Sequence, residues 1–376
     1  MLPVLINTIL ALSALYAPQP LLPTLCQEFS VSREAAAALT TVTFIPLAIA
    51  PLLYGYLLES LSATKLLKLA VLLLAISELL FAATNDFPLL LGLRLFQGLL
   101  IPAILTALMT YVSQSSNRET IQRSMAIYIA ATITGGFAGR AMSGLIAKLF
   151  GWQYSFIILA FSLLLGFALL FQLPETTKLK LSKPQPNILL QILRKPCFLP
   201  LYLAIFCLFL VFAAVMNYLP FRLTELSEQA DELRIGLMYS GYLMGIVTSL
   251  WAPKICRRLK NEAVVMQIGL ATFSVALLGL ATGHIAILFS VMFLFCAAMF
   301  LVHATASGLV NRLAGNDNQG LTNGLYVAFY YSGGAIGSYA PGLIYRSFGW
   351  NGFVLLLIAI SLLGLYCSRR IILTGR

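Results

Sequence analysis

The chain has 376 residues, of which 60% are hydrophobic and only 10% are charged. Soluble domains average about 45–50% and about 25%, so the composition excludes a water-soluble globule. The mean hydropathy of +0.91 extends along the whole chain, which also excludes a soluble domain carrying a single membrane anchor. The formal net charge of +11 raises the question of nucleic-acid binding, and the positions of the charges answer it.

Twelve apolar runs follow one another along the chain, and each is long enough to cross a bilayer as a helix. They cover residues 4–25, 35–58, 66–84, 88–112, 124–148, 153–173, 198–221, 235–255, 263–281, 285–309, 321–345 and 351–367. The first run lacks a basic leader and a small-residue cleavage site, so we interpret it as a retained helix and not as a signal peptide. The sequence therefore predicts an all-α integral membrane protein with both termini on the same side.

The basic residues are divided unequally between the two sides of this topology. Seventeen lysines and arginines fall on the side of the termini, and five fall on the opposite side. Because short cytoplasmic loops retain positive charge, we expect both termini in the cytoplasm and the chain in a bacterial-type inner membrane. The basic composition then reflects membrane orientation, and no nucleic-acid partner is expected.

The chain carries an internal repeat. Residues 128–152 match residues 326–350 at eleven of 25 positions, including glycines and aromatic residues in register. The longest polar break falls between the sixth and seventh runs. We therefore expect an N-terminal six-helix bundle over 1–174, a cytoplasmic linker over 175–196 and a C-terminal six-helix bundle over 197–376.

Local motifs give the chain a resemblance to the major facilitator superfamily over essentially its full length. The fourth run contains an arginine followed by a glutamine–glycine pair, as Arg94-Leu-Phe-Gln97-Gly98. The fifth run contains the glycine-rich stretch Gly135-Gly136-x-x-Gly139, with Gly144 beyond it, similar to a motif associated with antiporters of that family. The resemblance implies a twelve-helix transporter fold made of two six-helix repeats.

Further motifs are similar to a bacterial branch of drug and sugar efflux permeases. They are Tyr16-Ala-Pro-Gln-Pro20, Gly139-Arg140 and His303-Ala-Thr-Ala-Ser307. The loop after the second run keeps Gly55 and Glu59 but lacks the cation and the second glycine of the family pattern. The family pattern implies a cytoplasmic charge-relay latch in this loop, and this sequence departs from that pattern, with Gly55 and Glu59 as the remaining candidates.

Three charged residues lie inside predicted spans: Glu78, Arg94 and Arg140. Each lies about 12 Å from the outer boundary at about 1.5 Å per residue. A charge inside a membrane costs a few kcal/mol on insertion scales, so we expect one shared polar cluster. Glu78 would pair with one arginine, and the other would attract an anionic group or change partner on protonation. The alternative for Glu78 is that its side chain reaches the outer interface.

His303 is the only histidine inside a predicted span and is a candidate for proton coupling, with simple packing as the alternative. Glycines on matched faces of the fifth and eleventh spans indicate tight packing, or a hinge or seal in a conformational cycle. These are Gly135, Gly136, Gly139, Gly144, Gly333, Gly334 and Gly337. Gly98 belongs to the same class of conformational motif.

Neutral polar and aromatic residues in the first, seventh and eleventh spans are candidates for a substrate cavity, with interfacial anchoring as the alternative. They are Tyr16, Gln19, Asn217, Tyr218, Tyr330 and Tyr331, joined by Arg140.

The predicted function is export of small organic solutes by proton-coupled antiport with alternating access; the solutes would be drug-like, sugar-like or organic anions. No ATP-binding or hydrolase motif is present in the sequence, so we expect neither an enzyme nor a cofactor, and the six cysteines lack metal-ligand spacing. The expected partners are a small-molecule substrate, protons and the lipid bilayer, and the chain is expected to be a monomer. Alternatives are an uptake symporter or uniporter, a channel, and a transport-inactive sensor or scaffold.

Overall fold

The computed structural model describes residues 1–57, 62–115, 121–175, 186–314 and 319–371. The secondary-structure elements of several residues in these ranges are helices. The first part of the chain forms α1 (Leu2–Tyr16), η1 (Gln19–Leu21), α2 (Leu22–Glu28), α3 (Arg33–Leu57), α4 (Ala63–Ala83), α5 (Phe87–Ser115), α6 (Ile121–Phe150) and α7 (Trp152–Leu169). The second part forms α8 (Pro186–Arg194), α9 (Phe198–Leu226), α10 (Glu232–Met238), η3 (Tyr239–Leu243), α11 (Met244–Leu259), α12 (Glu262–Leu280), α13 (Ile285–Ala314) and α14 (Gln319–Arg369).

Ten segments of the described chain are long and apolar enough to cross a membrane. The last of them, within α14, holds two of the expected spans, and the thirty-residue α6 supplies the remaining one. Gly349 separates the two spans in α14 with φ of 68°, and Gly151 separates α6 from α7 with φ of 101°. Glycine adopts positive φ without a Cβ penalty. The Phe-Gly-Trp turn therefore reverses the chain between the last two spans of the first half (1–175) and of the second half (186–371). The predicted twelve-helix, all-α fold is confirmed.

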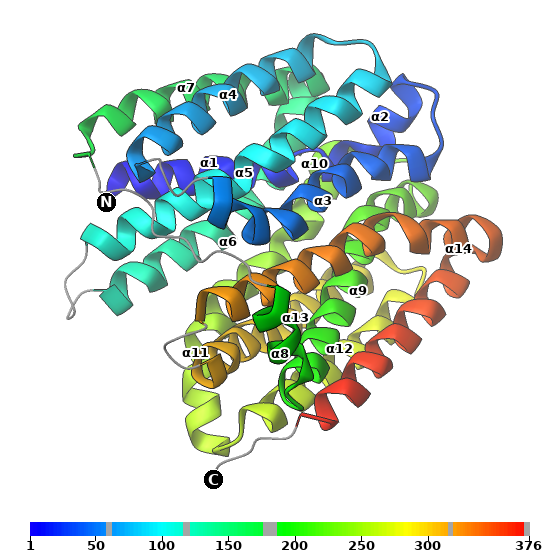
Figure 1. Ribbon diagram of the computed structural model, residues 1–376. Coiled ribbons are helices and arrows are strands. Elements are labelled where there is room, and N and C mark those ends of the chain that lie inside the picture. Colours follow the sequence, from blue (N-terminus) through cyan, green and yellow to red (C-terminus); the bar gives the residue numbers. More distant parts are fainter. Residues whose placement is uncertain (58–61, 116–120, 176–185, 315–318, 372–376) are drawn as a thin grey trace.

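Figure 1 shows the helices α1 to α7 of the first part of the chain, from blue through cyan to green, in its upper part, and α9 and α11 to α14 in its lower part. The nine-residue α8 lies within the expected linker. The N-terminus of α1 and the C-terminal end of α14 lie on the same side of the molecule, which we call the terminal face; the opposite side is the distal face.

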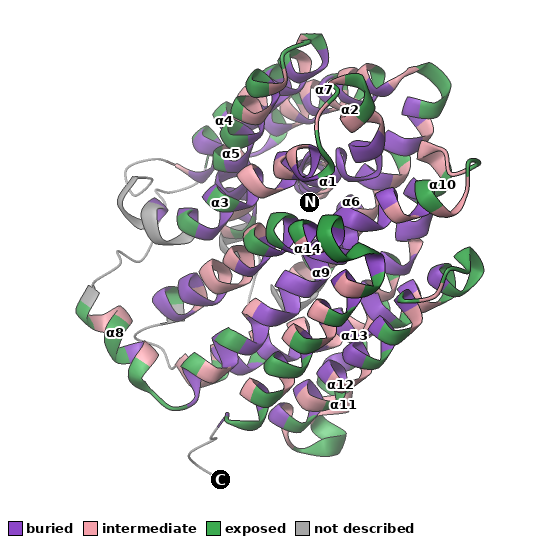
Figure 2. Ribbon diagram, turned by 90° about the vertical axis from the view of Figure 1, so that its right-hand side faces the viewer, coloured by how far each residue is buried: buried purple, intermediate pink, exposed green. Residues whose placement is uncertain are grey.

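The outward surface of the bundle is apolar in a way that suits lipid. Leu165, Leu355 and Phe171 each expose more than 60% of their surface, whereas Arg94, Arg140 and Glu78 are fully buried. Figure 2 shows this distribution, with the buried class concentrated on inner helix faces. Polar groups inside and large apolar side chains outside are expected where the surrounding solvent is hydrocarbon.

Two spans are interrupted by short 3-10 turns, and both turns pack against α6. In the first span, η1 follows Pro18 and contains Pro20, which lacks the backbone N–H that a regular helix would use. In the eighth, η3 joins α10 to α11. Interruptions of this kind are tolerated in a membrane protein where neighbouring helices satisfy the backbone, and these two place side chains around the middle of α6.

Candidate functional site

The glycine pattern brings helix backbones together within each half. A Cβ at Gly135 would come within 2.5 Å of the Ile9 carbonyl oxygen, and one at Gly139 would come within 2.5 Å of Ser13 Cα, so α6 packs directly on α1. In the second half, Gly333 and Gly337 approach the backbone of α9 equally closely. Gly98 packs α5 against Thr43 of α3 in the same way. These glycines serve close packing, the first of the two alternatives drawn from the sequence.

Three glycines of the same motifs have neighbours from the other half of the chain. A Cβ at Gly136 would meet the ring of Tyr242 of the second half, and one at Gly334 would meet Phe209 of its own half and Phe44 of the first half. A Cβ at Gly144 would collide with the backbone of Glu232 in α10. These positions lie where the halves touch, so they suit a seal that closes between them.

Gly139→Ala is expected to lower the free energy of unfolding by about 1–3 kcal/mol, because the added methyl group overpacks a contact between two backbones. Thermal unfolding of the purified protein in detergent measures the change. The matched control is Gly92→Ala, since nothing lies within 4 Å of a Cβ at that exposed position. Equal midpoints for the two variants would contradict the assignment of Gly139 to backbone packing.

Arg94 is buried inside the first half and is bound by backbone oxygens. Its guanidinium donates to the carbonyls of Leu39 (3.2 Å), Ala14 (3.0 Å) and Leu15 (2.8 Å), and to Gln97 Oε1 at 2.6 Å. It therefore joins α5 to both α1 and α3, which fixes the position of the α1 segment that ends at Tyr16.

Glu78 lies beside this arginine and does not reach the outer interface. It is fully buried, it interacts electrostatically with Arg94, and the Gln97 side chain is the neutral hydrogen-bond donor that acts on its carboxyl group. A buried carboxyl group with so few donors is suited to take up a proton, because protonation removes its buried charge.

Arg140 has a separate environment, where the two halves meet. Its Nε donates to Gln19 Oε1 at 2.7 Å, and its guanidinium also binds the Gly136 carbonyl. The guanidinium carbon lies 4.0 Å from the ring centroid of Tyr16, 4.7 Å from that of Tyr242 and 5.1 Å from that of Tyr239. No ion pair to a carboxylate is found for it among the described residues, so neutral groups and aromatic faces hold this charge.

The structure places the three intramembrane charges in two environments, with one arginine beside Glu78 and the other apart from it. Glu78 and Arg94 share an environment, whereas Arg140 binds Gln19 and the tyrosines. The three residues were expected at a common depth, but depth does not fix the direction in which a helical side chain points.

A chain of buried polar contacts continues from Arg140 across the boundary between the halves. Gln19 Nε2 donates to Asn217 Oδ1 at 3.0 Å, and Asn217 Nδ2 donates to the carbonyls of Ala37 (3.3 Å) and Ser338 (3.2 Å). Ser338 Oγ, at the position that repeats Arg140, lies 2.7 Å from Thr41 Oγ1. This network ties η1 and α3 of the first half to α9 and α14 of the second.

A cavity of about 380 Å³ lies between the halves on the terminal-face side of this network. Its first-half wall includes Leu12, Tyr16, Leu105, Met109 and Ile133. Its second-half wall includes Tyr242, Phe300, His303, Ser307, Asn311, Asn323, Tyr326, Tyr330 and Tyr331. One wall is thus largely apolar and the other is aromatic and polar.

The cavity continues toward the terminal face. A second hollow of about 980 Å³ shares Met109, His303 and Asn311 with it and reaches the exposed Arg257 and Lys260. Among the residues that the structure describes, the pathway is therefore open at the terminal face.

His303 lines both hollows and belongs to a polar stripe. Its Nδ1 lies 2.8 Å from Tyr326 Oη, and its ring centroid lies 4.8 Å from that of Tyr330. Ser307 and Asn311 follow at intervals of four residues, so they share its face of α13. The stripe runs from the mouth of the cavity to its inner end.

The predicted cavity residues divide into three groups. Tyr16, Tyr330 and Tyr331 line the cavity. Gln19, Asn217 and Arg140 lie behind it in the buried network. Tyr218 lies elsewhere: its hydroxyl donates to the Tyr339 carbonyl at 3.1 Å, and its ring packs against Tyr345 and Phe353.

The predicted loop motif near the terminal face is only partly visible. Gly55 lies in α3, and Glu59 falls outside the described residues.

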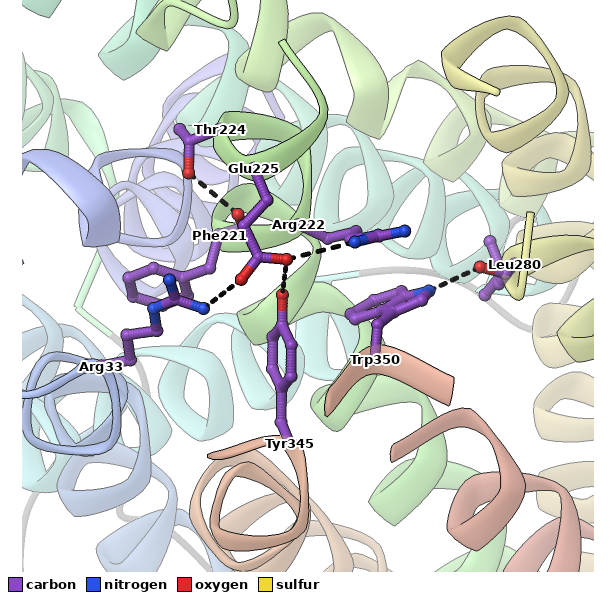
Figure 3. A network of polar contacts seen from close by, with 8 residues as sticks. All are labelled: Arg33, Phe221, Arg222, Thr224, Glu225, Leu280, Tyr345 and Trp350. Carbon is purple, nitrogen blue, oxygen red and sulfur yellow. Dashed lines mark hydrogen bonds and ion pairs between the residues drawn. The ribbon is translucent and has the colours of Figure 1, made fainter. Parts of the chain in front are cut away.

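The distal end of the pathway is closed by ion pairs and hydrogen bonds that the sequence interpretation did not identify. Figure 3 shows Glu225 at the end of α9 accepting from Arg33 of the first half, from Tyr345 Oη at 2.7 Å and from Arg222 at 3.2 Å. Lys148 Nζ lies 2.6 Å from Asp231 Oδ2. Thr24 Oγ1 of the first half also donates to Glu232 Oε1 of the second at 2.7 Å. We call the two ion pairs that cross between the halves here, Arg33–Glu225 and Lys148–Asp231, the distal closure.

The sequence shows the groups of this closure but not their pairing. Four acids occur within eight residues around the end of α9: Glu225, Glu228, Asp231 and Glu232. Because acids and bases of both halves mix on the distal side, only the packing of the halves selects Arg33 and Lys148 as the partners.

The Lys148–Asp231 ion pair is expected to weaken only when acid protonates Asp231. Burial raises the pKa of Asp231, but hydrogen bonds from Lys148 and from the Arg234 backbone outweigh this effect and hold the pKa below its usual value. A lowered pKa stabilises the closed form at pH values above the ordinary value of about 3.9, and this contribution is lost as the pH falls through the lowered pKa.

The distance between spin labels at Glu28 and Glu228 should therefore be unchanged from pH 8 to pH 5, and Asp231→Asn should lengthen it at pH 7. Opening of the unmodified closure already between pH 8 and pH 6 would contradict this assignment.

Comparisons with known proteins agree with this architecture. The Major Facilitator Superfamily profile matches residues 4–338 and 223–374. The inner membrane transport protein YnfM of Escherichia coli is 28% identical over 358 residues, covering 93% of this chain and 85% of that protein. The uncharacterized MFS-type transporter YybF of Bacillus subtilis is 26% identical over 373 residues, covering 94% and 88%.

Among solved structures, a bacterial homologue of the human lysosomal transporter Spinster, in an inward-facing and unoccupied conformation, has the same fold. Its TM-score is 0.77 at 12% identity, with 98% of this chain and 96% of that chain covered. The helices, the pathway between the halves and the family match lead to one conclusion: the chain belongs to the Major Facilitator Superfamily and is a multi-pass membrane transporter, not an enzyme.

Proposed function

We propose that the chain exports small organic solutes in exchange for protons, by alternating access between an N-terminal bundle (1–174) and a C-terminal bundle (197–376). The observation that carries the proposal is the asymmetry of the pathway. The hollow reaches exposed residues at the terminal face, whereas the distal closure and the Arg140–Gln19–Asn217 network join the halves at the other end. An alternating-access transporter passes through a state of this kind.

The direction of the pathway follows from the proposed orientation. The terminal face carries the excess of basic residues, so it is assigned to the cytoplasm. The solute would then enter the cavity from the cytoplasm and leave through the distal face after the closure opens. Bacterial relatives such as the inner membrane protein YnfM support an inner-membrane location.

Glu78 is the proposed proton site. Its carboxyl group is fully buried and lies beside the Arg94–Gln97 pair. Arg94 in turn binds the carbonyls of Ala14 and Leu15, directly before the cavity residue Tyr16. Protonation of Glu78 would change the electrostatic balance at Arg94 and so bias the position of α1. His303 is a second candidate, because it lines the cavity.

The test is proton movement in liposomes containing the purified protein, with a pooled panel of sugars, organic anions and amphipathic drugs. Proton flux that depends on a solute gradient, and solute counterflow that saturates, are the expected results. Solute movement without proton movement would make the chain a uniporter and would remove the role of Glu78. Absence of any solute movement would favour a sensor or scaffold.

A further inference from the structure

The cavity has an electrostatic and aromatic character that narrows the class of solute. We call the cavity of about 380 Å³ the inner hollow and the adjoining one of about 980 Å³ the outer hollow. None of the described residues that line the inner hollow is acidic. The outer hollow carries Arg257, Lys260 and Arg312 against one acid, Glu262, whose carboxylate lies 2.6 Å from Arg312 Nη1. A pathway whose lining has a net positive charge between low-dielectric walls concentrates anions.

Arg140 lies directly behind the cavity wall. Tyr16 and Tyr242 line the inner hollow with their rings against the guanidinium, which lies 4.0 Å and 4.7 Å from their centroids. Arg140 itself is fully buried and has no carboxylate partner among the described residues. A buried cation held by neutral groups leaves a positive potential, which an anion in the adjoining cavity would satisfy.

The walls of the inner hollow also offer aromatic and aliphatic surfaces against which a planar ring can pack. Tyr326, Tyr330 and His303 form one aromatic group, with Tyr330 stacked on Phe209 at a centroid separation of 3.7 Å. Leu105 and Ile133 lie in the opposite wall. A planar ring between an aromatic wall and an aliphatic wall buries both of its faces against apolar surface.

We propose that the cavity binds planar aromatic monoanions, of the aryl carboxylate class, with the ring between the tyrosine wall and the aliphatic wall and the carboxylate in the field of Arg140. The conclusion that such an anion is the transported solute rests on the proposed function, whereas binding of the anion is tested without transport. Such binding separates this site from one built for cationic drugs, which would require an acid in the lining, and from one built for sugars, which would not require a net positive field.

The experiment measures binding of three probes that share one ring system to the full chain in nanodiscs of zwitterionic lipid. The probes are 2-naphthoate, the neutral 2-naphthamide and the cationic 2-naphthylmethylammonium. We expect 2-naphthoate to bind at least about tenfold more tightly than the amide, and the cation to bind most weakly, because the three probes share the ring system and the positive field favours the anion. Equal affinities for the anion and the amide, or tightest binding of the cation, would overturn the proposal.

Variants locate the effect within the cavity. Arg140→Gln is expected to remove the preference for the anion while keeping amide binding, and Arg140→Lys is expected to retain part of that preference. Tyr330→Leu should weaken all three probes together. The matched control is Arg346→Gln, which removes an exposed cation outside both hollows and should change nothing. An anion preference that survives in Arg140→Gln would overturn the role given to this arginine.

The wild-type probe series needs no variant, so it decides the substrate class even if Arg140→Gln fails to fold. The outcome is also independent of proton coupling. Binding of 2-naphthoate without transport would support the substrate class and contradict the proposed function. Proton-coupled transport of a neutral or cationic solute, with no binding of 2-naphthoate, would support the proposed function and overturn the substrate class.

Discussion

A covalent link between positions 148 and 231 is expected to stop transport reversibly. Lys148 Nζ and Asp231 Oδ2 lie 2.6 Å apart across the distal closure, so Lys148→Cys with Asp231→Cys places two thiols where a bifunctional thiol reagent can join them. The six native cysteines are first replaced, because all of them are free thiols. Solute counterflow in liposomes should fall by about tenfold or more on linking, since alternating access requires this end to open.

Two controls make the result specific to the link. Each single cysteine variant should keep its transport after the same treatment, and cleavage of a reducible reagent should restore transport in the double variant. Fully linked protein, verified by mass spectrometry, that still transports at the unlinked rate would show that the distal ends do not separate during turnover.

Glu78→Gln is expected to uncouple the transporter without preventing solute binding. Glutamine has nearly the same shape and keeps an oxygen that can accept from Gln97, but it cannot take up a proton. Proton flux per solute moved should fall by about tenfold or more, while solute counterflow without a pH gradient continues, as expected for an ionisable group that carries protons inside a membrane.

The matched control for this experiment is Glu175→Gln, which changes an exposed carboxyl group near the terminal face. It should leave both activities unchanged. Wild-type coupling in Glu78→Gln, together with its loss in His303→Asn, would transfer the proton site to the cavity histidine.

The sequence predicts the fold because the governing signals are local. The apolar runs follow from the thickness of the bilayer, and the repeated Phe-Gly-Trp turns at Gly151 and Gly349 follow from the positive φ that glycine permits. The matched glycines of α6 and α14 likewise mark the backbones that pack closely on α1 and α9. These features depend on residue type and spacing, which a sequence contains.

The arrangement of the candidate site depends on direction as well as depth. Glu78, Arg94 and Arg140 were expected at one depth, but Arg94 points into its own half while Arg140 points to the boundary between the halves. Tyr242 escaped notice because it lies in the interrupted helix at η3, where helical periodicity no longer indicates which face a residue occupies. Partners far apart in sequence, such as Arg33 and Glu225, become neighbours only through the packing of the two halves.

Alternating access between the two halves is the central claim of this account. The most direct test is electron spin resonance distance measurement on the protein in liposomes, with one label pair at Glu28 and Glu228 across the distal face and another at Lys65 and Lys254 across the terminal face. Addition of a transported solute and a pH gradient should lengthen the distal distance and shorten the terminal one in the same fraction of molecules. A distal distance that stays fixed while the same preparation transports solute would contradict the account.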